Sequence, residues 1–356
     1  MKKTIIEIIQ NKNALNSIAS QWNERAKPFK SPLLSYEWFL SCTEAFYREE
    51  DIRVVVVRSG DNISAIAPLV IVKRNGIKWL ELIGVSFLYE PCGLLYDSED
   101  SLRALLKAIL ELRYPILLQR VPFNSTVARE LSALTKFKGK FVNRATSSSA
   151  YISINSDWEA YYTSISSQRR YDYRRKQKRV KKKGEISMEI FYPDPKKLDQ
   201  HLEMSFRIEA AGWKGRKGSA LLTNKKLQKF FRIYTELACR DGVLRIFFLN
   251  IGRESAGMLI GLEYANRFWV LKLGYDEKWA RCSPGIQLTM ETIRYAFENR
   301  LEAYEFLGSE EPWQNIWPHY CHTYSSLIVY PYSLYGLIGL GWDAQRFIMK
   351  KAFPPR

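Results

Sequence analysis

The sequence predicts an α/β (α+β) protein built from two tandem units, each a mixed, mostly antiparallel sheet flanked by helices. Three observations predict this fold class. Each half of the chain carries three strand-like runs separated by turn residues, each set continues into a segment with helical periodicity, and a further strand-like run follows. Two copies of one α/β unit account for this pattern, and the alternative is chance similarity between two ordinary α+β domains.

In the first half, the strand-like runs are "IRVVVVR", "ISAIAPLVIVK" and "IKWLELI". The turn "SGDN" separates the first two runs and has the composition of a β-hairpin turn, whereas "RNG" precedes the third. The segment "SLRALLKAILELRYPILLQRV" then combines a helical period with a final strand. This order predicts a meander followed by a helix and a strand.

The second half repeats the layout with "VLRIFFL", "SAGMLIGLEY" and "RFWVLKL", followed by "IQLTMETIRYAFENRLEAYEFLG". The two sets superpose at a constant offset, which places Gly60 opposite Gly252 and Ala65 opposite Gly257. We therefore expect an N-terminal unit at residues 1–150, a C-terminal unit at 151–330, and an amphipathic tail at 331–356.

The chain is strongly basic. Its 356 residues carry a formal net charge of +17, and 46% hydrophobic content is typical of a globular protein with a sizeable core. This charge favours anionic partners, namely nucleic acid, phosphorylated cofactors, acidic glycans or anionic lipid. It does not choose among these four classes.

The cysteine pattern and the N-terminal segment both favour a cytoplasmic protein. The five cysteines are scattered without a C-x-x-C pair, which suggests neither a disulfide framework nor a zinc finger. In "MKKTIIEIIQ", Glu7 interrupts the apolar run and no small-residue cleavage site follows, so export is not expected. The stretch Tyr330–Trp342 is too short to span a bilayer, but it suits peripheral membrane contact.

A basic segment, Ser166–Glu185, opens the second half. It holds ten Arg or Lys residues between Arg169 and Lys183 and one acid, Asp172. We predict a helix here, capped by Ser166 or Ser167, after a shorter helix that begins with the capping box Ser156-x-x-Glu159. Its charges must face water or an anion, so a nucleic-acid arm, a membrane patch and a substrate site all remain open.

The block after the third strand of the second half carries the clearest chemical signal. "SPG" (Ser283, Pro284, Gly285) opens an amphipathic helix, with Ser283 as its expected cap and Arg281 nearby. The backbone N–H groups at a helix start bind phosphate, and Gly285 removes a side chain that would block close approach. Most such loops only turn the chain.

The sequence resembles the GNAT acyltransferase superfamily, in its double-domain cellulose-biosynthesis-type (CelD-like) branch, which is related to the Fem peptidyltransferases. The similar segments follow one another along nearly the whole chain: "QWNERAKPFKSPLLSYEWFLSC", "SAIAPLVI", "SSQRRYDYRRKQKRVKKKG", "IEAAGWKGRKGSAL", "AGMLIGLEY", "LGYDEKWARCSPG" and "AYEFLG". Two features depart from the pattern: Arg281-x-x-x-Gly285 is a degenerate pyrophosphate loop, and "GSEEPWQ" lacks the lysine common among relatives.

The resemblance implies two GNAT-like units, with an acyl-CoA, most simply acetyl-CoA, bound by the second. Donor-binding residues would be Gly257, Met258, Arg281, Ser283 and Gly285. A backbone N–H within Ala256–Gly261, on a splayed central strand, would polarise the acyl carbonyl.

The resemblance also implies residues for proton transfer and acceptor binding. Glu209 and Asp276 are the candidate bases, and Tyr275 is the candidate acid for the leaving thiolate. A cap or turn role is the alternative for Asp276. Acceptor or anion contacts would come from the set Arg174, Arg175, Trp213 and Lys214.

A metal is not expected, because His319, Cys321 and His322 in "HYCH" match no common zinc spacing. The leading expectation is an acyltransferase that acts on an amine, such as an amino sugar or another glycan precursor. The alternatives are a Fem-like transferase that uses aminoacyl-tRNA and a non-enzymatic nucleic-acid-binding protein. The sequence does not indicate the acyl chain, the acceptor or the oligomeric state.

Overall fold

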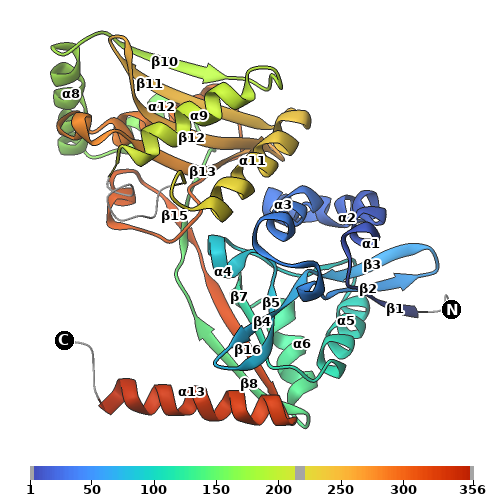
Figure 1. The fold of residues 1–356 in the computed structure, drawn as a ribbon. Helices are drawn as coiled ribbons and strands as arrows, with labels where there is room; N and C mark the ends of the chain where they lie inside the picture. Colours follow the sequence, from blue (N-terminus) through green and yellow to red (C-terminus); the bar gives the residue numbers. More distant parts are fainter. Residues whose placement is uncertain (1–3, 213–220, 353–356) are drawn as a thin grey trace. The chain divides into compact units, whose positions relative to one another are not determined.

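The computed structural model describes residues 4–212 and 221–352 (Figure 1). It divides into two compact units: Met1–Ser147 with Thr323–Arg356, and Ser148–His322. The expected second unit, 151–330, differs from this division at its C-terminal end. Strand β16 (Tyr324–Pro331) pairs with β7 (Ile116–Pro122) and β8 (Gly139–Ala145) of the first unit, so the chain returns to that unit after the second one.

The first unit contains two sheets, since Pro68 separates the expected long strand Ile63–Lys73 into β3 and β4. A proline lacks the N–H that a ladder requires. One sheet has the order β1 (Thr4–Ile9), β2 (Val54–Ser59), β3 (Asn62–Ala67), β6 (Leu95–Tyr96). The other has the order β4 (Leu69–Arg74), β5 (Ile77–Leu82), β7 (Ile116–Pro122), β16, β8 (Gly139–Ala145).

Helices flank these sheets. Helix α5 buries Leu102, Leu105 and Ile109, which recur with helical spacing, against β2 and β3. The α-helices are α1 (Lys12–Ser17), α2 (Ala19–Ala26), α3 (Tyr36–Phe46), α4 (Val85–Leu88), α5 (Glu99–Glu111), α6 (Thr126–Thr135) and α13 (Leu334–Ala352). Short 3₁₀ turns lie at Lys27–Phe29 (η1), Pro32–Leu34 (η2) and Glu49–Asp51 (η3).

The second unit has one seven-stranded sheet. Its order is β10 (Ile186–Phe191), β11 (Leu244–Ile251), β12 (Glu254–Tyr264), β13 (Arg267–Tyr275), β14 (Ala303–Glu305), β9 (Ser149–Ser153), β15 (Tyr320–His322). Strands β13 and β14 are parallel, and the other neighbours are antiparallel. The predicted fold class, mixed and mostly antiparallel sheets flanked by helices, is confirmed.

Helices cover this sheet on both faces. Leu273 and Tyr275 face α12 (Pro284–Glu298), whereas Lys272 and Gly274 face α9 (Leu198–Ala210), as the alternation of a strand requires. The elements are α7 (Trp158–Ser164), α8 (Ser167–Lys181), α9 (Leu198–Ala210), α11 (Lys225–Arg240), η4 (Glu277–Cys282), α12 (Pro284–Glu298) and η5 (Pro312–Ile316).

Three expected helix caps differ from the structure. Asp157, and not Ser156, caps α7, where its Oδ1 accepts from the N–H of Ala160 at 2.7 Å. Ser166 occupies the N-cap position of α8 without a side-chain hydrogen bond. Ser283 holds the N-cap position of α12 in a left-handed conformation and does not cap it with its side chain. Ser166 and Ser283 therefore hold the expected N-cap positions, but neither side chain caps its helix.

Candidate donor-binding site

Strands β13 and β14 pair only along their first residues. Arg267–Trp269 align with Ala303–Glu305. From Val270 to Tyr275, the edge of β13 that faces β14 pairs with no strand in the described part of the chain. The two parallel strands therefore diverge and leave backbone polar groups along that edge without a ladder partner.

The prediction that Ala256–Gly261 belongs to the splayed strand is wrong. This segment lies within β12, which pairs with β11 on one side and with β13 on the other. Both edges of β12 are thus used by the sheet, and its N–H groups already have ladder partners. The splay lies one strand further along, in β13.

Helix α12 begins where this open edge ends. Ser283 has φ 51° and ψ 56°, Pro284 occupies the first turn, and no acidic residue follows in that turn. The first N–H groups of a helix have no partner within the helix, and the helix dipole adds partial positive charge there. The start of α12 therefore has the features of an anion site.

Small residues leave space around this helix start. A Cβ atom on Gly285 would lie 3.4 Å from Cδ1 of Tyr275, and one on Gly257 would lie 3.5 Å from Cβ of Pro284. The structure therefore brings together Gly257, Tyr275, Ser283 and Gly285. Met258 is buried and points to the opposite face of β12, so its side chain is not in this group.

The basic helix α8 packs beside the loop that leads to α12. Nη1 of Arg179 donates to the carbonyl oxygen of Arg281 at 2.9 Å, and Val180 is buried in a cluster with Cys282. Further along, the Tyr173 hydroxyl donates to Oε1 of Glu291 at 2.9 Å, and burial together with this carboxylate raises the pKa of Tyr173. Helix α8 thus runs antiparallel to α12, with its basic C-terminal half near the anion site.

The predicted contact residues of α8 are exposed. Nη2 of Arg175 lies 3.0 Å from Oδ1 of Asp172, whereas Arg174 makes no ion pair with any described residue. Arg281 is also exposed, next to the start of α12. The other two predicted acceptor residues, Trp213 and Lys214, lie outside the described residues.

Glu209 is buried and bound on both carboxylate oxygens. Its Oε1 lies 3.0 Å from Nζ of Lys272, and its Oε2 accepts from the N–H of Leu221 at 2.8 Å. Its Cβ and Cγ pack on Gly274, on the α9 face of the sheet. This ion pair links α9 to β13, the strand with the open edge, and Lys272 is a residue that the sequence reasoning missed.

Asp276 caps the 3₁₀ turn η4. Its Oδ1 accepts from the N–H of Lys278 at 2.9 Å, and its carboxylate lies 3.7 Å from Nζ of that lysine. This geometry agrees with the alternative interpretation of Asp276 as a cap. Tyr275 immediately precedes it and faces the start of α12, so the two neighbours lie in different environments.

The histidines and cysteine of "HYCH" separate into two groups. Nε2 of His322 lies 3.0 Å from Oε2 of Glu305. His319 and Cys321 instead lie beside Glu310, and the potential metal-ligand atoms of these three residues are within 4.8 Å of one another. Burial and Glu310 raise the pKa of Cys321 to about 11, so its thiol stays protonated at neutral pH. Hydrogen bonds from Ser148, Cys321 and His319 lower the pKa of Glu310. Glu310 was not predicted, because it lies nine residues before His319.

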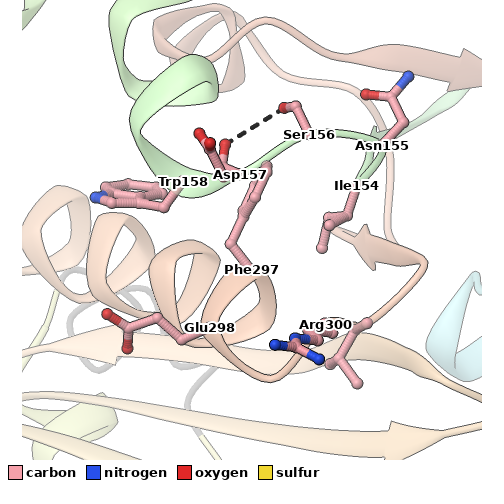
Figure 2. A pocket seen from close by; sticks show the side chains of 9 residues that line it. Ile154, Asn155, Ser156, Asp157, Trp158, Phe297, Glu298 and Arg300 are labelled. Carbon is pink, nitrogen blue, oxygen red and sulfur yellow. Dashed lines mark hydrogen bonds between the residues drawn. The ribbon is translucent and has the colours of Figure 1, made fainter.

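A hollow of about 460 Å³ lies at the other end of α12 (Figure 2). Its lining includes Asp157, Glu298 and Arg300, together with the rings of Trp158 and Phe297. A helix C-terminus carries partial negative charge, and two carboxylates add to it. This hollow therefore suits a phosphate less well than the start of α12 does.

Comparisons with known proteins agree with this geometry. Residues 167–315 match the family model described as an acetyltransferase (GNAT) domain. No match was found among the curated proteins.

Three solved structures share the fold. FemX is similar with a TM-score of 0.59 at 14% identity, over 88% of this chain and 96% of that one. The C-terminal domain of a putative lysylphosphatidylglycerol synthetase from Agrobacterium fabrum has a TM-score of 0.58 at 9% identity, over 92% and 95%. A conserved protein of unknown function from Bacteroides thetaiotaomicron VPI-5482 has a TM-score of 0.54 at 10% identity, over 91% and 99%.

The matched segment contains α8, the open edge of β13 and the start of α12. The second unit therefore carries a GNAT acetyltransferase domain, and the protein is an enzyme of the GNAT transferase type. The expected relation to the GNAT superfamily is confirmed, and the fold likeness extends to FemX. At 9–14% identity, these structures show the shared fold.

Proposed function

We propose that the protein is an acyltransferase of the double-domain CelD-like branch, which moves an acyl group from acyl-CoA, most simply acetyl-CoA, to an amine. One observation carries this proposal. The unpaired edge of β13, Val270–Tyr275, ends beside a helix start that has neither a side-chain cap nor an acidic residue in its first turn. A donor with amide groups and a pyrophosphate needs both features side by side.

The residues present fit such a donor. The N–H groups of Gly285 and Ile286 would hold the pyrophosphate, since Gly285 and Gly257 leave the space that side chains would fill. The edge of β13 would pair with the amides of the CoA arm, as a sheet edge pairs with an added strand. When bound, the thioester supplies an activated acyl group. Exposed α8 side chains, Arg174 among them, would attract the donor phosphates.

The chain's own side chains supply the proton transfers in this proposal. Tyr275 faces the start of α12 and is the proposed acid for the leaving thiolate. Glu209 and Asp276 remain the proposed bases, although Glu209 is paired with Lys272 and Asp276 caps η4. If Glu209→Gln and Asp276→Asn both kept full turnover with an identified substrate pair, neither would be the base.

The proposed acceptor is an amine of an amino sugar or of another polysaccharide precursor. This class rests on the resemblance to the CelD-like branch, and Trp213 and Lys214 are its proposed contacts. A cytoplasmic location is proposed because all five cysteines are free thiols, which suits a reducing compartment.

A second candidate is a transferase that uses aminoacyl-tRNA, without a CoA donor. Two observations favour it: the exposed basic side chains of α8, and the fold shared with FemX and the lysylphosphatidylglycerol synthetase domain. RNA phosphates bound along α8 would make the affinity fall steeply with salt.

Thermal-shift titration separates the two candidates. A ligand that binds the native state raises the melting temperature by mass action. Acetyl-CoA, longer acyl-CoAs and tRNA are each titrated at two salt concentrations. Stabilisation by an acyl-CoA supports the proposal, stabilisation by tRNA alone would replace it with the second candidate, and no shift with any ligand would contradict both.

A further inference from the structure

Most of the large apolar side chains described on the C-terminal helix α13 point away from its own unit. Leu334, Ile338 and Trp342 recur every four residues, and the exposed fractions of these residues are 73%, 41% and 44%. A helix on the surface of a globular protein normally directs such a stripe inward. This helix does the reverse.

Two glycines, Asp343 and the partly buried Leu340 form the inward face of α13. A Cβ atom on Gly339 would lie 3.2 Å from Cζ2 of Trp79, and one on Gly336 would collide with Pro331. The carboxylate of Asp343, the single acid of α13, accepts a hydrogen bond from the Tyr330 hydroxyl. The helix thus packs closely on β5 and β16 through its glycines, while its apolar stripe remains outside.

The apolar stripe continues onto neighbouring loops of the first unit. The N–H of Tyr332 donates to the carbonyl oxygen of Lys138 at 2.9 Å, which brings the 84%-exposed Phe137 to the start of α13. The ring of Tyr335 stacks on Tyr114 with centroids 6.0 Å apart. We call this surface the α13 face; its exposed apolar members are Phe137, Tyr332, Leu334, Tyr335, Leu337, Ile338 and Trp342.

Basic residues border the α13 face. The Ser333 hydroxyl donates to the carbonyl oxygen of Arg113 at 2.8 Å, and Arg113, Lys136 and Lys138 are all exposed. Nζ of Lys136 lies 5.6 Å from the centre of the Phe137 ring. Charge around this surface is therefore positive, next to an apolar and aromatic centre.

We infer that the α13 face binds the surface of an anionic lipid bilayer, with α13 lying in the interface. Aromatic side chains favour the boundary between headgroups and acyl chains, and Lys and Arg bind anionic headgroups. No helix in the described part of the chain has the length and apolarity to cross a bilayer, so the contact is peripheral.

The charge distribution favours lipid over a second copy of the chain. A symmetric dimer places the same patch on both subunits, so the basic border with Arg113, Lys136 and Lys138 would face a patch with the same basic border. Like charges brought together in this way oppose association. An anionic bilayer instead complements the basic border and covers the apolar centre at once.

Vesicle co-sedimentation of the full-length protein tests this inference. The vesicles contain phosphatidylcholine alone or phosphatidylcholine with phosphatidylglycerol. We expect the wild type to bind the second kind of vesicle. Binding should be at least about 100-fold weaker in the triple variant Leu334→Glu/Ile338→Glu/Trp342→Glu. It should be at least about tenfold weaker in the double variant Lys136→Glu/Lys138→Glu. Leu334→Ser/Ile338→Ser is a milder variant, checked like the others by circular dichroism, and should also bind more weakly.

The matched control is Lys181→Glu/Lys182→Glu at the C-terminal end of α8, which makes the same change in net charge in the other unit. Its vesicle affinity should stay within about twofold of the wild type. If this variant and Lys136→Glu/Lys138→Glu lost vesicle affinity equally, the inference would be overturned. Binding of the wild type that does not need phosphatidylglycerol would overturn it too. So would a wild-type dimer in light scattering that Leu334→Ser/Ile338→Ser converts to a monomer, because the occupant would then be a second copy.

Discussion

Helices α5 and α12 occupy equivalent places in the two units, yet their first turns differ. Along the chain, each helix comes between the two strands of a parallel pair. These strands are β5 and β7 for α5, and β13 and β14 for α12. Ser98 caps α5 by accepting from the N–H of Ser101 at 3.2 Å, and Glu99 and Asp100 follow in the first turn. The start of α12 has neither feature.

This difference separates a structural helix start from a binding one. In α5, the Ser98 hydroxyl satisfies the N–H of Ser101, and two carboxylates offset the helix dipole. In α12, the same groups are left for an external anion. The two units therefore share an arrangement of elements, but the second one has the features that hold an anionic donor.

Gly285→Asp should have the largest effect on this difference, because it gives α12 an acidic first turn like that of α5. A carboxylate at a helix start favours the helix, so the fold should be kept, while donor affinity falls about 100-fold through lost space and charge repulsion. Calorimetric titration with acetyl-CoA measures the affinity, and Ser98→Gly is the control that should leave it unchanged. Full affinity in Gly285→Asp would contradict the assigned site.

Glu209→Gln should lower the free energy of unfolding by about 2 kcal/mol, because Lys272 loses its buried partner. The control is Asp276→Asn, whose amide oxygen can still cap η4 and which should cost less than about 1 kcal/mol. Urea unfolding of both variants checks this order. Equal losses would show that the ion pair between α9 and β13 has no special structural role.

Arg174→Glu/Arg175→Glu should raise the KM of an anionic substrate about tenfold at low salt and less at high salt, because ions screen exposed charges. Steady-state kinetics at two ionic strengths measure this change. Lys225→Glu/Lys226→Glu on α11 is a control with the same change in net charge. An unchanged KM would show that α8 is a solvated surface helix without a role in substrate binding.

The smallest expected effect concerns the two serines at the helix starts. Ser98→Ala should cost about 1 kcal/mol of stability because a cap is lost, whereas Ser283→Ala should cost less than about 0.5 kcal/mol because its side chain caps nothing. Thermal unfolding of both variants checks this. A larger loss for Ser283→Ala would mean that α12 is capped like α5.

Local patterns predicted much of the fold. The turn "SGDN" gave the hairpin of β2 and β3, and Pro284 with Gly285 marked the start of α12. Short-range turn and cap chemistry decides both features, so one segment of sequence contains the information.

Long-range pairing was less predictable. The return of β16 to the first unit and the divergence of β13 from β14 depend on partners far along the chain. Nothing in "SAGMLIGLEY" or "RFWVLKL" shows which strand keeps an unpaired edge, and the splay was therefore placed one strand too early. The partner of Glu209, Lys272, could not be found either, since burial and pairing arise only when α9 packs on β13.

Hydrogen exchange measured by mass spectrometry, with and without acetyl-CoA, tests the central claim most directly. Exchange rates report the opening of individual backbone segments, so a bound donor protects the amides that it contacts. We predict protection of Val270–Tyr275 and of the first turn of α12, with no change in the first turn of α5. Protection at Ser98–Leu102, or none in the second unit at saturating acetyl-CoA, would contradict it.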